Sequence, residues 1–234
     1  MQIQDMVLFI TGANRGLGLA FARAALEMGA KKVYAAARDP ARILLPGVHA
    51  VRLDVTRAED ADAAAENCRD VNVLINNAGI SRGSSVLAAG GMDAARAEFE
   101  TNFYGPWRMS QAFAPVLAAQ DGGAIVNVLS ALSWLNLPGC STYCTSKSAA
   151  WGLTNALRNE LRAQRTQVLG LHVGFMDTDL TAGLNVTKVS PDDVASQTLI
   201  ALAAGHEEVL ADATSRDAKR VLSAEPGIYL QPAA

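Results

Sequence analysis

Short apolar-rich runs recur along the chain and are separated by longer stretches in which apolar and polar positions mix. The clearest run is Met6-Val-Leu-Phe-Ile10, which contains no polar side chain. Short continuous runs of this kind are typical of strands that are buried on both faces of a parallel sheet. The pattern predicts seven strands, at residues 6–10, 32–37, 49–53, 71–75, 124–129, 167–173 and 207–210.

The stretches between these strands predict helices at residues 19–28, 58–68, 93–120, 142–163, 191–204 and 215–223. Pro106 and Pro115 are expected to bend or interrupt the long span, because proline removes a backbone donor and clashes with the preceding turn. Strands and helices that alternate at this spacing predict a single α/β domain over residues 1–234. We expect a Rossmann-like, doubly wound parallel sheet flanked by helices.

A glycine-rich turn, Thr11-Gly-Ala-Asn-Arg-Gly-Leu-Gly18, follows the first predicted strand. Gly12 allows a tight turn, while Gly16 and Gly18 allow the backbone and the next helix to come close to a pyrophosphate. The spacing is Gly-x-x-x-Gly-x-Gly, and a plain strand-to-helix turn is the alternative interpretation. Its place after a buried strand favours a nucleotide site.

The identity of the nucleotide depends on the end of the second strand. An NAD site would place an acidic side chain there to bind the ribose 2′-hydroxyl, whereas this strand ends at Ala37 and Arg38 follows. Arg38 and Arg15 together could bind a 2′-phosphate by charge-assisted hydrogen bonds. The alternatives are two solvated surface arginines, or an Arg38 neutralised by Asp39. NADP(H) is the cofactor we expect.

Composition narrows the classes of partner. The chain has 234 residues, is 50% hydrophobic and carries a net charge of −3, which argues against nucleic acid as the main partner. The three cysteines and three histidines show no zinc-binding pattern, so no metal is expected. No apolar run approaches the roughly 20 residues that span a bilayer, and no signal peptide is evident. We therefore expect a cytoplasmic protein without a membrane partner.

Tyr143 and Lys147 are four residues apart near the start of a predicted helix, so their side chains share one helix face. A nearby positive charge lowers the pKa of a phenol, which would make Tyr143 usable in proton transfer. Two unrelated helix residues are the alternative interpretation of this spacing alone.

Four features in order resemble the short-chain dehydrogenase/reductase family, over about residues 6–180. They are the glycine turn, Asn76-Asn-Ala-Gly79, Asn102-Phe-Tyr-Gly105, and Ser130 placed thirteen residues before Tyr143-x-x-x-Lys147. The arginines before Gly16 and after the second strand resemble those of the NADP-preferring members.

The resemblance implies hydride transfer between a nicotinamide and a carbonyl carbon. Tyr143 would exchange a proton with the carbonyl oxygen, and Lys147 would lower the pKa of Tyr143 and bind the nicotinamide ribose. Ser130 would hold the carbonyl oxygen, and Ser133 is the alternative residue for this role. Asn102 would support a proton-relay water near Lys147.

The resemblance also implies further contacts with the cofactor. Asp54 resembles a residue beside the adenine, although a turn-forming aspartate is an equal alternative. Val173-Gly174 stands where the family usually has Pro-Gly, so we expect this loop to be less rigid. Together with Gly12, Arg15, Gly16, Gly18, Arg38, Tyr143 and Lys147, the expected cofactor-binding residues are Asn14, Leu17, Asp54, Val55, Asn77, Ala78, Gly79, Gly174, Phe175 and Thr178.

The expected substrate is a hydrophobic or aromatic ketone or aldehyde, reduced reversibly to an alcohol. The loops after the fifth and sixth strands are apolar, and Leu132, Trp134, Leu180 and Leu184 are the expected lining residues. Residues 175–190 would form the substrate loop, and the stretch 180–189, which has no evident anchor, would be a mobile lid. A homodimer through the helices near 100–120 and 142–163 is expected, and a monomer is the alternative.

Three other functions remain open on the sequence. They are an NAD-dependent alcohol dehydrogenase of the same family, a nucleotide-sensing protein without catalysis, and a methyltransferase that binds S-adenosylmethionine at the glycine turn. A nucleotide-sensing protein would leave Ser130, Tyr143 and Lys147 without a function. A methyltransferase would leave Arg15 and Arg38 without one.

Overall fold

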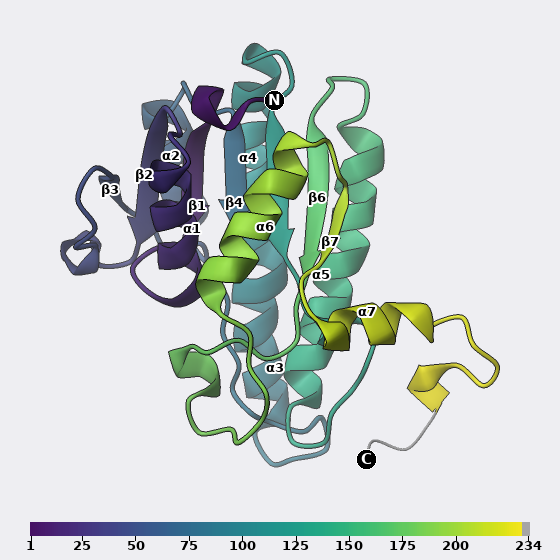
Figure 1. Ribbon diagram of the computed structural model, residues 1–234. Coiled ribbons are helices and arrows are strands. Elements are labelled where there is room, and N and C mark those ends of the chain that lie inside the picture. The colour runs from purple at the N-terminus through teal and green to yellow at the C-terminus, as the bar shows by residue number, and fades with distance from the viewer. Residues whose placement is uncertain (231–234) are drawn as a thin grey trace.

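The computed structural model describes residues 1–230 and consists of one parallel sheet covered by helices on both faces (Figure 1). The strand order is β3-β2-β1-β4-β5-β6-β7. The strands are β1 (Val7–Thr11), β2 (Lys32–Ala37), β3 (His49–Arg52), β4 (Val73–Asn76), β5 (Ala124–Val128), β6 (Gln167–His172) and β7 (Glu208–Leu210). The predicted doubly wound α/β fold is confirmed.

The helices pack in two layers, one on each face of the sheet (Figure 1). One layer contains α1 (Gly16–Glu27) and α6 (Pro191–Ala203), and the other contains α2 (Ala58–Asn67), α4 (Gly105–Ala119) and α5 (Ser141–Glu160). Neighbouring residues of β1 point to opposite layers: Leu8 lies in the first core, whereas Phe9 lies in the second. Burial on both faces explains why the inner strands β1, β4 and β5 lack polar alternation, whereas the edge strand β3 is largely exposed.

The long helical span differs from its prediction. It begins earlier, as α3 (Gly91–Phe99), passes through a π-helical turn, η3 (Glu100–Tyr104), and continues as α4. Pro106 lies in the first turn of α4, where its missing N–H costs little, and Pro115 lies inside that helix. Neither proline ends the span. Its one irregularity is the π turn that precedes Pro106.

Several boundaries also shift by a few residues. The first helix begins at Gly16 instead of residue 19, so its N-terminus opens directly onto the glycine turn. The last helix, α7, spans Ala213–Arg220, because Asp212 accepts a hydrogen bond from Ser215 N and caps it earlier than predicted.

The strands end at one edge of the sheet, at the bottom of Figure 1, and the loops that follow β4, β5 and β6 gather there. The chain runs from β1 to β2 on one side and from β3 across to β4 on the other, so the strand order reverses between β1 and β4. In such folds the crevice outside this point is the usual ligand site.

Candidate active site

Helix α5 carries Tyr143 and Lys147 one turn apart at the carboxyl edge of the sheet. Lys147 is 5% exposed, and its Nζ donates a 2.8 Å hydrogen bond to the main-chain oxygen of Val128, the last residue of β5. The same nitrogen lies 5.8 Å from the centroid of the Tyr143 ring. The structure therefore brings the predicted pair together, with the ammonium over the ring.

The surroundings shift the pKa values of these two side chains in opposite directions. Burial raises the pKa of Tyr143 well above its ordinary value, because the phenolate would lose hydration, and the Ser130 hydroxyl acts in the opposite direction. Burial lowers the pKa of Lys147 to about 8, because the ammonium loses hydration. We expected Lys147 to lower the pKa of Tyr143, but the effect of burial on that pKa is larger and raises it.

Ser130 follows β5 and caps the short 3-10 turn η4 (Ala131–Ser133). Its Oγ accepts a hydrogen bond from Leu132 N at 3.1 Å and donates to the oxygen of Val173 at 3.4 Å. The rival hydroxyl of Ser133 accepts from Ser130 N and completes the capping box. Of the two, Ser130 is the one whose hydroxyl influences the Tyr143 phenol.

Asn102 lies in the π turn and is 1% exposed. Its Oδ1 accepts from Ile80 N at 2.9 Å, and its Nδ2 donates to Ile80 O and to Ser146 Oγ, each at 2.9 Å. A Cβ added to Gly79 would lie 3.3 Å from Asn102 Oδ1 and 3.8 Å from Lys147 Nζ. Asn102 is thus close to Lys147, and its side chain fixes the main chain that follows Gly79.

The glycine turn is packed against the segment that follows β4. Gly12 and Gly16 have φ values of +68° and +54°, which favour glycine. A Cβ on Gly18 would lie 2.5 Å from Asn77 Nδ2 and closer still to Gly12 O. Asn77 Nδ2 donates to the main-chain oxygens of Thr11 and Gly12, at 2.9 and 3.2 Å. The N-terminus of α1, which a nucleotide phosphate would approach, therefore packs closely against this turn.

Other predicted nucleotide contacts surround this turn. Ala78 N donates to Thr11 Oγ1 at 3.0 Å, and Thr178 lies beside Gly16, with Cγ2 3.5 Å from a Cβ built there. Asn14 is half-buried in the turn, whereas the Leu17 side chain is buried in the core below α1.

The two predicted arginines differ in their partners. Arg15 Nη1 pairs with Asp179 Oδ2 at 2.7 Å, and both side chains are exposed. Arg38 is exposed at the end of β2 and forms no ion pair with Asp39, because Asp39 Oδ1 instead accepts from Ala41 N at 3.1 Å. Asp39 therefore caps a short turn and leaves the Arg38 guanidinium exposed.

Asp54 forms a turn, and its contact with an adenine stays a prediction. Its Oδ1 accepts from Thr56 N and Thr56 Oγ1, at 3.0 and 2.7 Å. Burial acts to raise the pKa of Asp54, but the Thr56 hydrogen bonds and the positive charge of Arg38 lower it overall. Val55 is 7% exposed and contacts Gly105 at the start of α4.

The loop after β6 is more firmly held than the Val173-Gly174 sequence indicates. Gly174 N donates to Asp212 Oδ2 at 2.7 Å, and a Cβ on Gly174 would collide with that oxygen. Asp212 also caps α7, so one buried carboxylate joins this loop to the last helix. No spacing in the sequence connects these two residues, which lie 38 positions apart.

The predicted substrate loop, residues 175–190, is held by contacts that the sequence does not reveal. Phe175 O accepts from Val189 N at 2.9 Å, and a bridge pairs Met176 with Val189. The short turn η5 (Asp179–Thr181) is tied to the glycine turn by the Arg15–Asp179 pair. These contacts hold the two ends of the predicted lid, residues 180–189, and its mobility stays a prediction.

The predicted substrate residues occupy different environments. Leu180 and Leu184 are exposed on the loop after β6, and Leu132 is half-buried behind Ser130. Trp134 is 6% exposed and stacks on the His172 ring, with centroids 3.9 Å apart and planes inclined by 18°. Trp134 thus contributes to packing, and its contact with a substrate stays a prediction.

His172 is a buried residue that the sequence prediction did not include. Its Nδ1 lies 3.1 Å from Ser130 O, and burial lowers its pKa to about 4, so the ring is neutral at pH 7 and Nδ1 donates to this carbonyl. It therefore helps to fix the main chain of Ser130 from the neighbouring strand. A histidine inside an apolar strand was the available signal.

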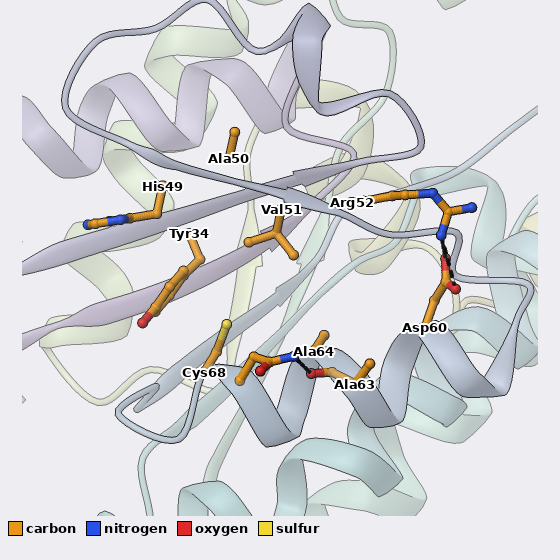
Figure 2. A pocket seen from close by; sticks show the side chains of 10 residues that line it. Tyr34, His49, Ala50, Val51, Arg52, Asp60, Ala63, Ala64 and Cys68 are labelled. Atoms are coloured by element: carbon orange, nitrogen blue, oxygen red, sulfur yellow. Dashed lines mark hydrogen bonds and ion pairs between the residues drawn. The ribbon is translucent and has the colours of Figure 1, made fainter.

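A hollow of about 300 Å³ lies away from this site, between β2, β3 and α2. Figure 2 shows Tyr34 and Cys68 facing it and the Arg52–Asp60 pair at one end. None of the predicted site residues lines it. Across residues 1–230, the structure has no helix long and apolar enough to cross a membrane and no group of three metal-binding side chains.

Comparison with known proteins places the chain among oxidoreductases. Residues 6–188 match the family model described as short chain dehydrogenase. A solved short chain dehydrogenase from Burkholderia cenocepacia J2315, in complex with NADP, is 38% identical, with a TM-score of 0.92 over 97% of this chain and 96% of that one.

Two curated relatives are more distant in sequence. The oxidoreductase DltE of Bacillus subtilis is 30% identical, covering 94% of this chain and 96% of the relative. The 3-oxoacyl-[acyl-carrier-protein] reductase FabG of Vibrio harveyi is 28% identical, covering 88% and 85%.

Proposed function

The chain belongs to the short-chain dehydrogenase/reductase family, and we propose that it is an NADPH-dependent reductase of a hydrophobic or aromatic ketone or aldehyde. The observation that carries the proposal is the cluster of Ser130, Tyr143 and Lys147 at the carboxyl edge of the sheet. The reaction is reversible, so the same groups oxidise the product alcohol.

The residues present fit a dinucleotide. A Cβ on Gly18 would collide with Gly12 O and Asn77 Nδ2, so glycine is what lets the N-terminus of α1, where a phosphate would bind, pack closely against the turn. The Arg38 guanidinium is exposed at the end of β2, where a 2′-phosphate of NADP would be bound. Arg15 would provide a second positive charge by leaving Asp179.

When bound, NADPH supplies the hydride. Tyr143 donates its phenolic proton to the carbonyl oxygen, and its raised pKa keeps that proton in place at neutral pH. The Ser130 hydroxyl, released from Val173 O, donates a hydrogen bond to the same oxygen and stabilises the charge that develops on it. Lys147 would hold the ribose hydroxyls with its ammonium, while Asn102 fixes the main chain that follows Gly79.

An absorbance assay with NADPH and a panel of aromatic ketones, aliphatic aldehydes and a 3-oxoacyl ester tests the proposal. Oxidation of NADPH with at least one of these carbonyls is the expected result. Turnover with NADH in place of NADPH would favour the NAD-dependent alternative. Cofactor binding without any turnover across pH 5 to 10 would favour a nucleotide-sensing protein.

A second copy of this chain is the partner that we propose, through α4 and α5. The proposal is supported by Tyr104 and Trp107, whose rings stack on the surface of this helical span and are 42% and 41% exposed. Exposed aromatic side chains of this size are enriched at protein interfaces. The substrate loop, residues 175–190, would cover the side of the substrate that faces away from Tyr143.

A further inference from the structure

One buried carboxyl group near Tyr143 has no part in the proposed chemistry. Glu98 lies in the last turn of α3 and is 0% exposed. Its Oε1 accepts a 2.6 Å hydrogen bond from the main-chain N of Arg82, and its Oε2 has no hydrogen-bond partner within residues 1–230. Burial of a carboxyl group with one oxygen unpaired is costly, so this position requires a compensating role.

The segment that Glu98 holds lies beside the candidate site. It begins after Gly79 and is fixed at three successive points. Asn102 binds both the N–H and the C=O of Ile80, Glu98 binds Arg82 N, and the Thr142 hydroxyl donates to Ser84 O at 3.0 Å. Thr142 is the residue before Tyr143, so the segment 80–84 connects the surroundings of Lys147 with the start of α5.

Glu98 and Asn102 are four residues apart along α3 and the π turn, and both point to this segment. At 2.6 Å, the Glu98 contact is the shortest of the hydrogen bonds at the three fixing points. Arg82 and Gly83 are themselves exposed to solvent.

We propose that Glu98 is a positioning residue of the reductase: its carboxyl group holds Arg82 so that the segment 80–84 forms a fixed wall against which the substrate carbonyl is oriented toward Tyr143. This inference rests on the proposed function. It assigns a role to a residue outside the Ser130, Tyr143 and Lys147 cluster.

Glu98 also lies near the phenol of Tyr143. Burial is the main cause of the raised pKa of Tyr143, and the Glu98 carboxyl group adds to it only slightly.

Hydrogen exchange tests the positioning without turnover. In Glu98→Ala, the Arg82 amide is expected to exchange about tenfold faster or more, while the Ile80 amide, which Asn102 holds, stays protected. Asp93→Asn is the matched control, because Asp93 is an exposed carboxylate of the same helix, paired with Arg96. Unchanged exchange at Arg82 would overturn the proposal, whether or not the protein reduces any carbonyl.

Kinetics test the consequence for the reaction. Glu98→Ala is expected to raise the KM of the carbonyl about tenfold, with the Kd of NADPH unchanged; an unchanged KM would also overturn the proposal. Glu98→Gln keeps an oxygen acceptor for Arg82 and covers the case in which the alanine variant does not fold. It is expected to keep Arg82 protected and to keep the KM of the carbonyl within about twofold of the wild type, so that the conservative variant rescues what the alanine variant loses. A glutamine variant with the raised KM of the alanine variant would show that the acceptor for Arg82 does not orient the carbonyl.

Discussion

The ammonium of Lys147 donates a 2.8 Å hydrogen bond to the main-chain oxygen of Val128, at the end of strand β5. This bond fixes a buried positive charge at the sheet edge where the glycine turn and Asn102 also lie. Because that charge is buried, the pKa of Lys147 is lowered to about 8, which places its titration within the range of an ordinary assay.

The first prediction concerns the pH dependence of NADPH binding. Lys147 is charged below its pKa of about 8 and neutral above it, so its attraction for the ribose hydroxyls is lost as pH rises. The Kd of NADPH, measured by fluorescence, should rise by up to about tenfold per pH unit above 8. Lys147→Met should bind weakly at every pH, and Tyr143→Phe should keep the wild-type dependence. A Kd that is constant from pH 7 to 9.5 would exclude this role.

The second prediction concerns cofactor choice. Arg38→Asp replaces an exposed positive charge at the end of β2 with an acidic group that suits a ribose hydroxyl. The ratio of kcat/KM for NADPH to that for NADH should fall by about 10 to 100-fold, since a hydrogen bond to a charged group contributes about 1.5–3 kcal/mol. Arg42→Asp, also an exposed arginine of the same loop, is the control and should leave the ratio unchanged. A wild type that favours NADH would show that Arg38 has no such role.

The third prediction concerns the glycine turn. Gly18→Ala would push a methyl group against Asn77 Nδ2 and the Gly12 main chain, so it should lower the free energy of unfolding by about 1–3 kcal/mol and weaken NADPH binding. Gly183→Ala, where nothing lies within 4 Å of the added carbon, should change neither. Thermal unfolding with and without NADPH measures both effects. Equal melting temperatures for the two variants would mean that the turn is looser than its contacts indicate.

The fourth prediction concerns assembly. Trp107→Lys places a charge in the proposed contact between copies and should convert a dimer into a monomer in sedimentation velocity. Ile200→Lys, on the exposed face of α6 in the other helix layer, is the control and should remain dimeric. A wild type that sediments as a monomer would refute the proposed interface.

The strands and their layering could be predicted because both faces of the sheet are covered, so that each buried strand appears as a short apolar run. Tyr143 and Lys147 could be paired because residues four apart on a helix share a face whatever the surrounding fold. The turn at Gly12 could be identified because few other residues adopt a φ of +68°.

The features that could not be predicted depend on contacts between distant segments. Gly174 meets Asp212 only once α7 has docked, and the Arg15–Asp179 pair joins residues 164 positions apart. The π turn at Asn102 adds one residue to a helical turn without a distinct composition. The raised pKa of Tyr143 is a result of burial, which spacing along the chain does not report.

Proton transfer by Tyr143 is most directly tested by comparing the wild type with Tyr143→Phe. The phenylalanine ring keeps the packing of the phenol but has no proton to donate. The variant should lose about 10²- to 10⁴-fold in kcat for NADPH-dependent carbonyl reduction, with the Kd of NADPH within about twofold of the wild type. A Tyr143→Phe variant that reduces the same carbonyl at the wild-type rate would contradict the proposed role of Tyr143.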